Sequence, residues 1–317
     1  MFSEAQNVAI VRTELDSVFY PEFNYEDSNP IMTTAKNGMI FAQETTDRAY
    51  DIEEVFKGVN LAPIITESQT VPTSTPKVAN KITTQIKDFG QSVELSKDLF
   101  DDNMHNVWAN VVKDLALKMR VTIDQNAFKI FRGAFTTTLT ADGVAMCGNH
   151  ALLNGAFYSN NLYDITAATT VLSSTSLNSA IVALAQQPDQ TGVVLGQQPQ
   201  ILLVPPALIK LALELSDSAL AGDVSTNALN VFRSAYGYRV FSSPYMGTGV
   251  VGGSDTAWFL LGRRHGIKRI VRQGIETFLR PWGYSNNRTY LYQANLREEV
   301  VCIDYSGIVG AKGQAAA

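Results

Sequence analysis

The sequence has too few long apolar stretches, cysteines and basic residues for several common classes of protein. No run approaches the roughly 18 consecutive apolar residues that a membrane helix needs. The N-terminus lacks a basic segment leading into an apolar one, so no secretory signal is predicted. Two cysteines among 317 residues exclude a disulfide framework and fit a reducing compartment. The net charge of −5 argues against a nucleic-acid binder that neutralises many phosphates.

Recognisable catalytic and metal-binding motifs are also missing. No GxSxG elbow, P-loop or HExxH motif occurs. Cys147 and His150 have the spacing of two zinc ligands, but no second pair of ligands accompanies them. Gly247, Gly249 and Gly252 match GxGxxG, yet a strand-like run follows where a dinucleotide site needs a helix. We therefore predict no catalytic, cofactor or metal site. An α/β enzyme whose site is assembled from distant residues stays open as an alternative.

The N-terminal residues predict a short helix followed by an acidic arm. Apolar residues recur at helical spacing over residues 4–19 and include Val11 and Leu15. Pro21 is expected to end this helix. Because the acidic segment after it can bury little, we expect the arm to be mobile in an isolated subunit.

A projecting hairpin is predicted over residues 55–95. Two extended, β-branched runs flank the proline-rich sequence VPTSTP. Lys77 and Lys81 lie on one side of the second run, and Val78 and Ile82 lie on the other. The hairpin carries too little apolar surface to form a core of its own, so it is expected to need a partner that covers it.

Residues 105–132 predict the longest helix. Its apolar stripe includes Trp108 and Leu115, which we expect to be buried, whereas Lys118 and Asp124 are expected to lie away from most of the stripe. At 1.5 Å per residue such a helix is about 40 Å long and would act as a structural spine. The sequence beyond it alternates helix-like and strand-like runs, which indicates a mixed α and β domain.

Charge is distributed unevenly along the chain. Residues 1–60 carry 11 acidic and 4 basic side chains, whereas residues 261–317 carry 9 basic and 4 acidic ones. The two ends could attract each other within one chain or between copies, or the imbalance could be incidental. The densest basic cluster is predicted at residues 263–272 and includes Arg263, Arg264, Lys268 and Arg269.

Several segments, in this order, resemble those of tailed-bacteriophage major capsid proteins. AQNVAIVRTELDSVFYPEF resembles an N-terminal arm, and KITTQIKDFGQSVELSKDLFDDN resembles the return strand of an extended loop that passes into a spine helix. DGVAMCGNHALLN resembles the turn after that helix. LGQQPQILLVPPALIKLALEL, YRVFSSPYMG and DTAWFLLG resemble the later strands and helix. The chain is therefore identified as a member of the Hong Kong 97-type capsid family.

This resemblance implies an α+β fold with an N-terminal arm, an extended β-hairpin loop, a long spine helix, a peripheral domain and an axial domain. The implied boundaries are 1–45 for the arm and 46–96 for the loop. The peripheral domain would comprise 97–165 and 265–298, and the axial domain 166–264 and 299–317.

The resemblance also implies function and partners. The expected protein is a structural head protein, not an enzyme, that self-assembles through hexamers and pentamers into an icosahedral shell around double-stranded DNA. A portal protein and scaffolding or decoration proteins are implied partners, without a membrane, a cofactor or sequence-specific DNA binding. The virion, assembled in the bacterial host cytoplasm, is the implied location. An encapsulin-like nanocompartment shell of the same fold is the alternative.

Residues proposed for the subunit interfaces follow from the arm, the loop and the charge asymmetry. A net-negative shell is expected to contain its DNA mechanically and not by charge. Although some relatives crosslink through a lysine of the extended loop, no acceptor can be identified here, so no crosslink is predicted. The interface candidates are Val11, Leu15, Lys77, Lys81, Arg263, Arg264, Lys268 and Arg269.

Overall fold

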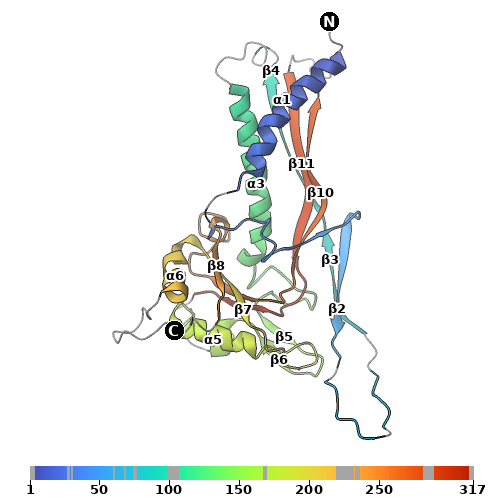
Figure 1. Cartoon of the computed structure of the whole chain (residues 1–317), viewed down its shortest axis with the longest axis vertical. Helices are drawn as coiled ribbons and strands as arrows, with labels where there is room; N and C mark the ends of the chain where they lie inside the picture. Colours follow the sequence, from blue (N-terminus) through green and yellow to red (C-terminus); the bar gives the residue numbers. More distant parts are fainter. Residues whose placement is uncertain are drawn as a thin grey trace.

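The computed structural model describes the chain except for residues 1–3, 27–28, 30, 60, 68, 74–76, 97, 99–106, 167–169, 219–231, 233–235, 281–288 and 314–317. Figure 1 shows an elongated molecule with α1, α3 and long strands at one end and a second group of strands and helices at the other. A two-stranded hairpin, β2 and β3, projects from the side of the molecule.

The first half of the chain supplies the long helices, the hairpin and one edge of the larger strand layer. Its elements are α1 (Glu4–Asn24), β1 (Ala42–Thr45), β2 (Tyr50–Lys57), β3 (Lys77–Gln85), β4 (Lys87–Ser96), α3 (Val107–Arg132), β5 (Asn149–Ala151) and β6 (Phe157–Ser159). Among the described residues, none of the helices is long and apolar enough to cross a bilayer.

The second half of the chain supplies the remaining strands and three short α-helices. Its elements are α4 (Leu162–Thr166), α5 (Ser174–Ala185), β7 (Pro199–Val204), the 3₁₀ helix η2 (Pro206–Leu208), α6 (Ile209–Asp217), β8 (Arg239–Ser242), the 3₁₀ helix η3 (Pro244–Met246), β9 (Trp258–Gly262), β10 (Ile267–Arg280), β11 (Thr289–Cys302) and β12 (Ile308–Ala311).

Two four-stranded sheets organise these elements. The first has the order β1-β10-β11-β4, and β11 pairs with both β10 and β4 in antiparallel register. The second has the order β12-β9-β7-β8, in which β7 and β8 are parallel. Residues 31–33 extend the second sheet, because Thr33 N donates to Ser242 O and Ser242 N donates to Ile31 O. The N-terminal segment therefore touches the second sheet before it enters the first as β1.

The spine helix α3 packs its apolar stripe against the first sheet and α1. Leu115 is only 2% exposed, and Phe128 and Phe131 lie in the same core. Trp108, which was expected to be buried, is only half-buried, because it lies in the first turn of α3 at the edge of the core. The sequence also predicts helix N-caps at residues 101–103, which lie outside the described part of the chain.

The prediction of a mobile N-terminal arm is wrong for α1, which packs on the core of the subunit. Val11, Leu15, Phe19 and Phe23 are all buried in the core that α3 lines. The helix also continues through Pro21, where it was expected to end. Phe19 and Phe23 lie on either side of this proline, with ring centroids 5.8 Å apart. Burying two such rings stabilises the helix by more than about 3 kcal/mol, which offsets the cost of a proline inside it.

The strand boundaries differ from the expected ones in three places. The second half of the hairpin predicted over residues 55–95 divides at Ile86 into β3, which belongs to the hairpin, and β4, which belongs to the first sheet. Two strand-like runs, 267–273 and 275–280, predict two strands, but they form one strand, β10, with a register shift between Gln273 and Glu276. A strand-like run at residues 298–305 predicts a strand there, but β11 already begins at Thr289. Each difference arises because pairing with a neighbouring strand decides where a strand begins and ends.

We predict that Leu115→Asp destabilises the subunit by about 3–5 kcal/mol, because it places an unpaired charge in the core of α3. Lys118→Ala is the matched control on the same helix, since its side chain is exposed and its pairing with Asp114 spans 3.9 Å. This control should change stability by less than about 0.5 kcal/mol. Urea denaturation of unassembled subunits measures both values, and equal tolerance of the two changes would contradict the packing of α3.

Candidate assembly surfaces

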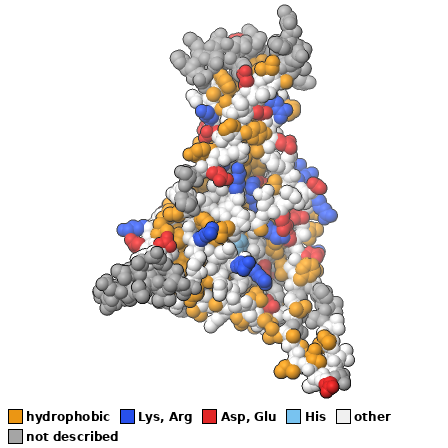
Figure 2. Space-filling view, viewed as in Figure 1, with side chains coloured by type: hydrophobic (Ala, Val, Ile, Leu, Met, Phe, Trp, Pro, Cys, Tyr) orange, Lys and Arg blue, Asp and Glu red, His pale blue; other side chains and the backbone are white. Residues whose placement is uncertain are grey.

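The hairpin carries a series of apolar side chains that the subunit does not cover. β2 and β3 pair from Tyr50 opposite Gln85 to Lys57 opposite Lys77. Figure 2 shows orange side chains along this projection down to its tip. Contiguous exposed apolar surface of this kind marks a site of protein–protein contact. The exposed apolar residues are Ile52, Phe56, Val59, Leu61, Ile64, Ile65, Val71 and Val78.

Lys268 joins the base of the hairpin to the first sheet. Its Nζ lies 2.7 Å from Glu44 Oε1 on β1 and 2.9 Å from Glu53 Oε1 on β2. Burial opposes the charge on Lys268, but the hydrogen bonds to the two glutamates outweigh it and raise the lysine pKa. Acidic residues near the N-terminal end thus pair with a basic residue near the C-terminal end of the same subunit. Lys268 is therefore already paired and is not available for an ion pair with a neighbouring subunit.

Arg269 forms a buried pair with Glu298 on the adjacent strand. Arg269 Nε lies 3.0 Å from Glu298 Oε2, and both side chains are buried. Burial raises the pKa of Glu298 although Arg269 opposes the change. Next to this pair, Lys87 of β4 forms an ion pair with Glu299. These contacts hold β10, β11 and β4 together at the level where the hairpin leaves the body.

The structure places the predicted interface residues in three different environments. Val11 and Leu15 are buried against α3, so neither is exposed to a neighbouring copy in this conformation. Lys77 and Lys81 both lie on β3, where Lys81 is exposed opposite Glu54. The basic cluster expected at residues 263–272 is divided. Arg263 and Arg264 are exposed in the turn between β9 and β10, whereas Lys268 and Arg269 pair with acidic residues of the same subunit.

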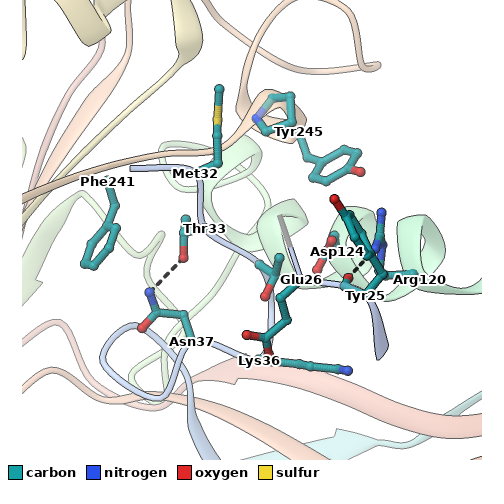
Figure 3. Close-up of a pocket in the computed structure, with 12 residues that line it drawn as sticks. Tyr25, Glu26, Met32, Thr33, Lys36, Asn37, Arg120, Asp124, Phe241 and Tyr245 are labelled. Atoms are coloured by element: carbon teal, nitrogen blue, oxygen red, sulfur yellow. Dashed lines mark hydrogen bonds between the residues drawn. The ribbon is translucent and has the colours of Figure 1, made fainter. Parts of the chain in front are cut away.

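A pocket of about 420 Å³ lies where the N-terminal segment, α3 and β8 meet, and Asp124 of α3 is one of the residues that line it. Asp124 was expected to lie off the apolar stripe, but it is 4% exposed, and its Oδ1 accepts a hydrogen bond of 2.7 Å from Ala35 N. Burial raises the pKa of Asp124 to about 6. Figure 3 shows Asp124 beside Arg120, which donates to the Tyr25 carbonyl, with Lys36 and Glu26 on the facing segment. The helical period alone cannot reveal this burial, since it depends on residues 31–41 crossing that face of α3.

The Cys147/His150 pair and the glycine-rich segment that begins at Gly247 are parts of the fold of the subunit. Cys147 and His150 are buried, and His150 Nδ1 lies 2.6 Å from Asp142 Oδ2. Burial opposes the charge on Asp142, but hydrogen bonds from His150 and Thr140 lower its pKa. No group of three or more potential metal ligands gathers within the described ranges. The glycine-rich segment that begins at Gly247 forms a turn between η3 and the strand β9.

The described subunit combines two sheets, a long helix and a hairpin whose apolar side chains are exposed. The family model described as phage capsid protein matches residues 79–311, and the chain belongs to this family. It is a major capsid protein of the virion, which self-assembles into a multimeric shell. No curated protein matches the sequence.

Solved structures show the same Hong Kong 97-type fold at low sequence identity. A chain of Microbacterium phage Oxtober96 has a TM-score of 0.55 at 12% identity, covering 90% of this chain and 93% of that one. The mature capsid of bacteriophage PhiM1 has a TM-score of 0.55 at 14% identity, with coverages of 91% and 90%. A virus-like particle from Pyrococcus furiosus has a TM-score of 0.52 at 9% identity, with coverages of 94% and 98%. The family match favours a phage capsid over the encapsulin-like alternative.

We predict that Asp124→Asn stabilises the subunit above pH 7 by up to about 3 kcal/mol. The raised pKa means that the folded state binds more protons than the unfolded state between about pH 4 and 6. Ionisation of Asp124 therefore removes stability as the pH rises through this range, whereas the neutral amide can still accept from Ala35 N. Urea denaturation at pH 5 and pH 8 measures the difference.

Asp114→Asn, an exposed position on the same helix, is the control and should retain the pH dependence of the original chain. An Asp124→Asn subunit that is less stable than the original chain at pH 8 would contradict the assignment of a destabilising buried charge.

Proposed function

We propose that the chain assembles through hexamers and pentamers into the icosahedral head of a tailed phage, with the hairpin lying across a neighbouring subunit. The observation that carries this proposal is the series of exposed apolar side chains on β2, β3 and the segment between them. Ordering a projecting segment costs backbone entropy without burying apolar surface in the subunit itself. A neighbouring copy that covers the segment supplies the missing burial.

The two sheets are the basis of the proposed domain division. The first sheet with α3 would be the peripheral domain, and the second sheet with α5 and α6 would be the axial domain around the capsomere centre. Because β11 continues to Cys302 without a break, we place the passage into the axial domain after that residue and not at 298/299. Residues 1–45, proposed as the arm, include the docked helix α1 and β1, and the extended loop comprises 46–96.

The further partners and the location follow from this assignment. A portal protein, scaffolding or decoration proteins and packaged double-stranded DNA, bound without sequence specificity, are the proposed partners, and the host cytoplasm is the proposed place of assembly. We propose no catalytic activity. Burial raises the pKa of both Cys147 and Cys302, which disfavours the thiolate that a nucleophilic role requires.

We predict that the double variant Leu61→Asp/Ile64→Asp folds but does not form shells. Both side chains lie on the segment between β2 and β3, and Ile64 is 93% exposed, so the change leaves the core of the subunit intact. In the assembly it would bury two unpaired charges against a neighbour. Sedimentation and negative-stain microscopy distinguish shells from free subunits.

Val251→Asp is the matched control, because Val251 is 96% exposed but belongs to an isolated turn. Shells of this control should form normally, with unchanged circular dichroism in all variants. Normal shells from the Leu61→Asp/Ile64→Asp variant would contradict the proposed contact of the hairpin with a neighbour.

A further inference from the structure

We propose that a basic patch made of Lys36, Arg239, Arg263 and Arg264 contacts the phosphate backbone of the enclosed DNA. This inference rests on the proposed function, since it requires a DNA partner, and it adds the surface through which the subunit meets that partner. The net charge of −5 conceals this local excess of positive charge.

The fold brings the three arginines together from two segments, and Lys36 belongs to a third segment that contacts them through Met39. Arg239 is the first residue of β8 and pairs with Ile201 of β7. Ile201 pairs on its other side with Leu261, which lies near the end of β9. Arg263 and Arg264 follow at once, so the three arginines lie at the same end of the second sheet. Met39 joins them to the N-terminal segment, because Arg239 Nη1 lies 3.6 Å from Met39 Sδ and His265 Nε2 lies 2.8 Å from Met39 O. Lys36 lies three residues before Met39 in this segment.

The patch lies on an accessible face of the molecule. All four cationic residues are exposed. Figure 2 shows lysine and arginine side chains in the middle of this face beside a pale-blue histidine. His265 is the histidine that the described structure leaves partly exposed, since His150 is fully buried.

The four cations differ from several other basic residues, which form ion pairs within the subunit. Lys87, Lys268, Arg269 and Arg297 all form ion pairs with carboxylates of the same subunit. Within the described ranges, no carboxylate lies within 4.0 Å of the charged atoms of Lys36, Arg239, Arg263 or Arg264. A chain with more acidic than basic residues thus leaves this group of cations available to an external anion.

A phosphate backbone fits this patch better than another protein does. Three of the four cations are guanidinium groups, whose planar donors match phosphate oxygens in bidentate geometry. A protein interface has an apolar core, but the residues that flank these cations in the chain, including Tyr238, Val240 and Gly262, add no exposed large apolar side chain. Cations spread over three segments suit an extended, repeating anion and carry no base-specific geometry.

The test compares Arg239→Gln/Arg263→Gln/Arg264→Gln with the original full-length chain. Fluorescence anisotropy with unassembled subunits and a mixed-sequence duplex DNA is recorded over a range of salt concentrations. We expect the variant to bind about tenfold more weakly or worse at low salt, and its slope of log affinity against log salt to fall by about 2 to 3. Arg239→Lys/Arg263→Lys/Arg264→Lys keeps the charge and should retain most of the affinity and of the slope.

A second control removes three exposed cations elsewhere. Lys113→Gln/Lys118→Gln/Lys210→Gln has the same net charge as the glutamine variant of the patch, and it should bind DNA like the original chain. Equal binding by the original chain and the patch variant would overturn the proposal, as would equal losses in the two glutamine variants.

Assembly of the same proteins without DNA separates the remaining outcomes. If the patch variant binds DNA normally but forms no shells, the patch contacts a second copy of the chain, and the DNA proposal is wrong. If the original chain forms no shells under any condition, the proposed function fails, and the anisotropy result still decides the role of the patch. DNA binding that is absent from the original subunit would overturn the inference alone.

Discussion

The apolar stripe of α3 is the constraint on which the rest of the subunit depends. α1 packs against it with Leu15 and Phe19, while β11 and β4 of the first sheet pack against it with residues such as Tyr292 and Leu95. These parts are separated by many residues in sequence, and the helix joins them in one core. The helix, α1 and the first sheet therefore form one column, to which the second sheet is joined through the same core.

Charged groups specify the geometry where the column meets the hairpin. The Arg269–Glu298 pair is buried between β10 and β11, and the Lys268 contacts with Glu44 and Glu53 join β10 to β1 and β2. A buried pair contributes little net stability, but separating its partners costs about 3–5 kcal/mol. Such contacts penalise alternative registers of these strands. They therefore favour one direction for the hairpin, which a symmetric shell requires of each copy.

Local sequence patterns predict the elements of this fold better than its tertiary contacts. The period of α3 identifies the spine and the burial of Leu115, and β-branched runs around prolines identify the hairpin. The same period misplaces Asp124, because its burial is decided by residues 31–41, which are distant in sequence. The N-terminal arm was predicted to be mobile for a similar reason. The acidic composition of residues 1–60 is a local property, whereas the burial of Leu15 and Phe19 depends on contact with α3. The pairing of Lys268 with two glutamates depends on the parallel alignment of β1 with β10. The composition of the chain does not reveal this alignment.

The chain as a whole is negatively charged, whereas the basic patch is positively charged. Both can influence DNA, because net charge and local charge act over different distances. Exposed charges are screened beyond about 8 Å at physiological ionic strength, so at longer range a net-negative shell neither attracts nor tightly holds DNA. Within that distance the unpaired arginines dominate over the average charge. Each exposed contact is weak, at most about 1 kcal/mol for an ion pair, and a single subunit would exchange its DNA rapidly. In a closed shell the same weak contact is repeated over every copy, so the enclosed DNA can be ordered near the wall while each contact still breaks easily. Strong, sequence-reading contacts would oppose the movement of DNA into and out of such a container, whereas the proposed surface would provide charge without base recognition.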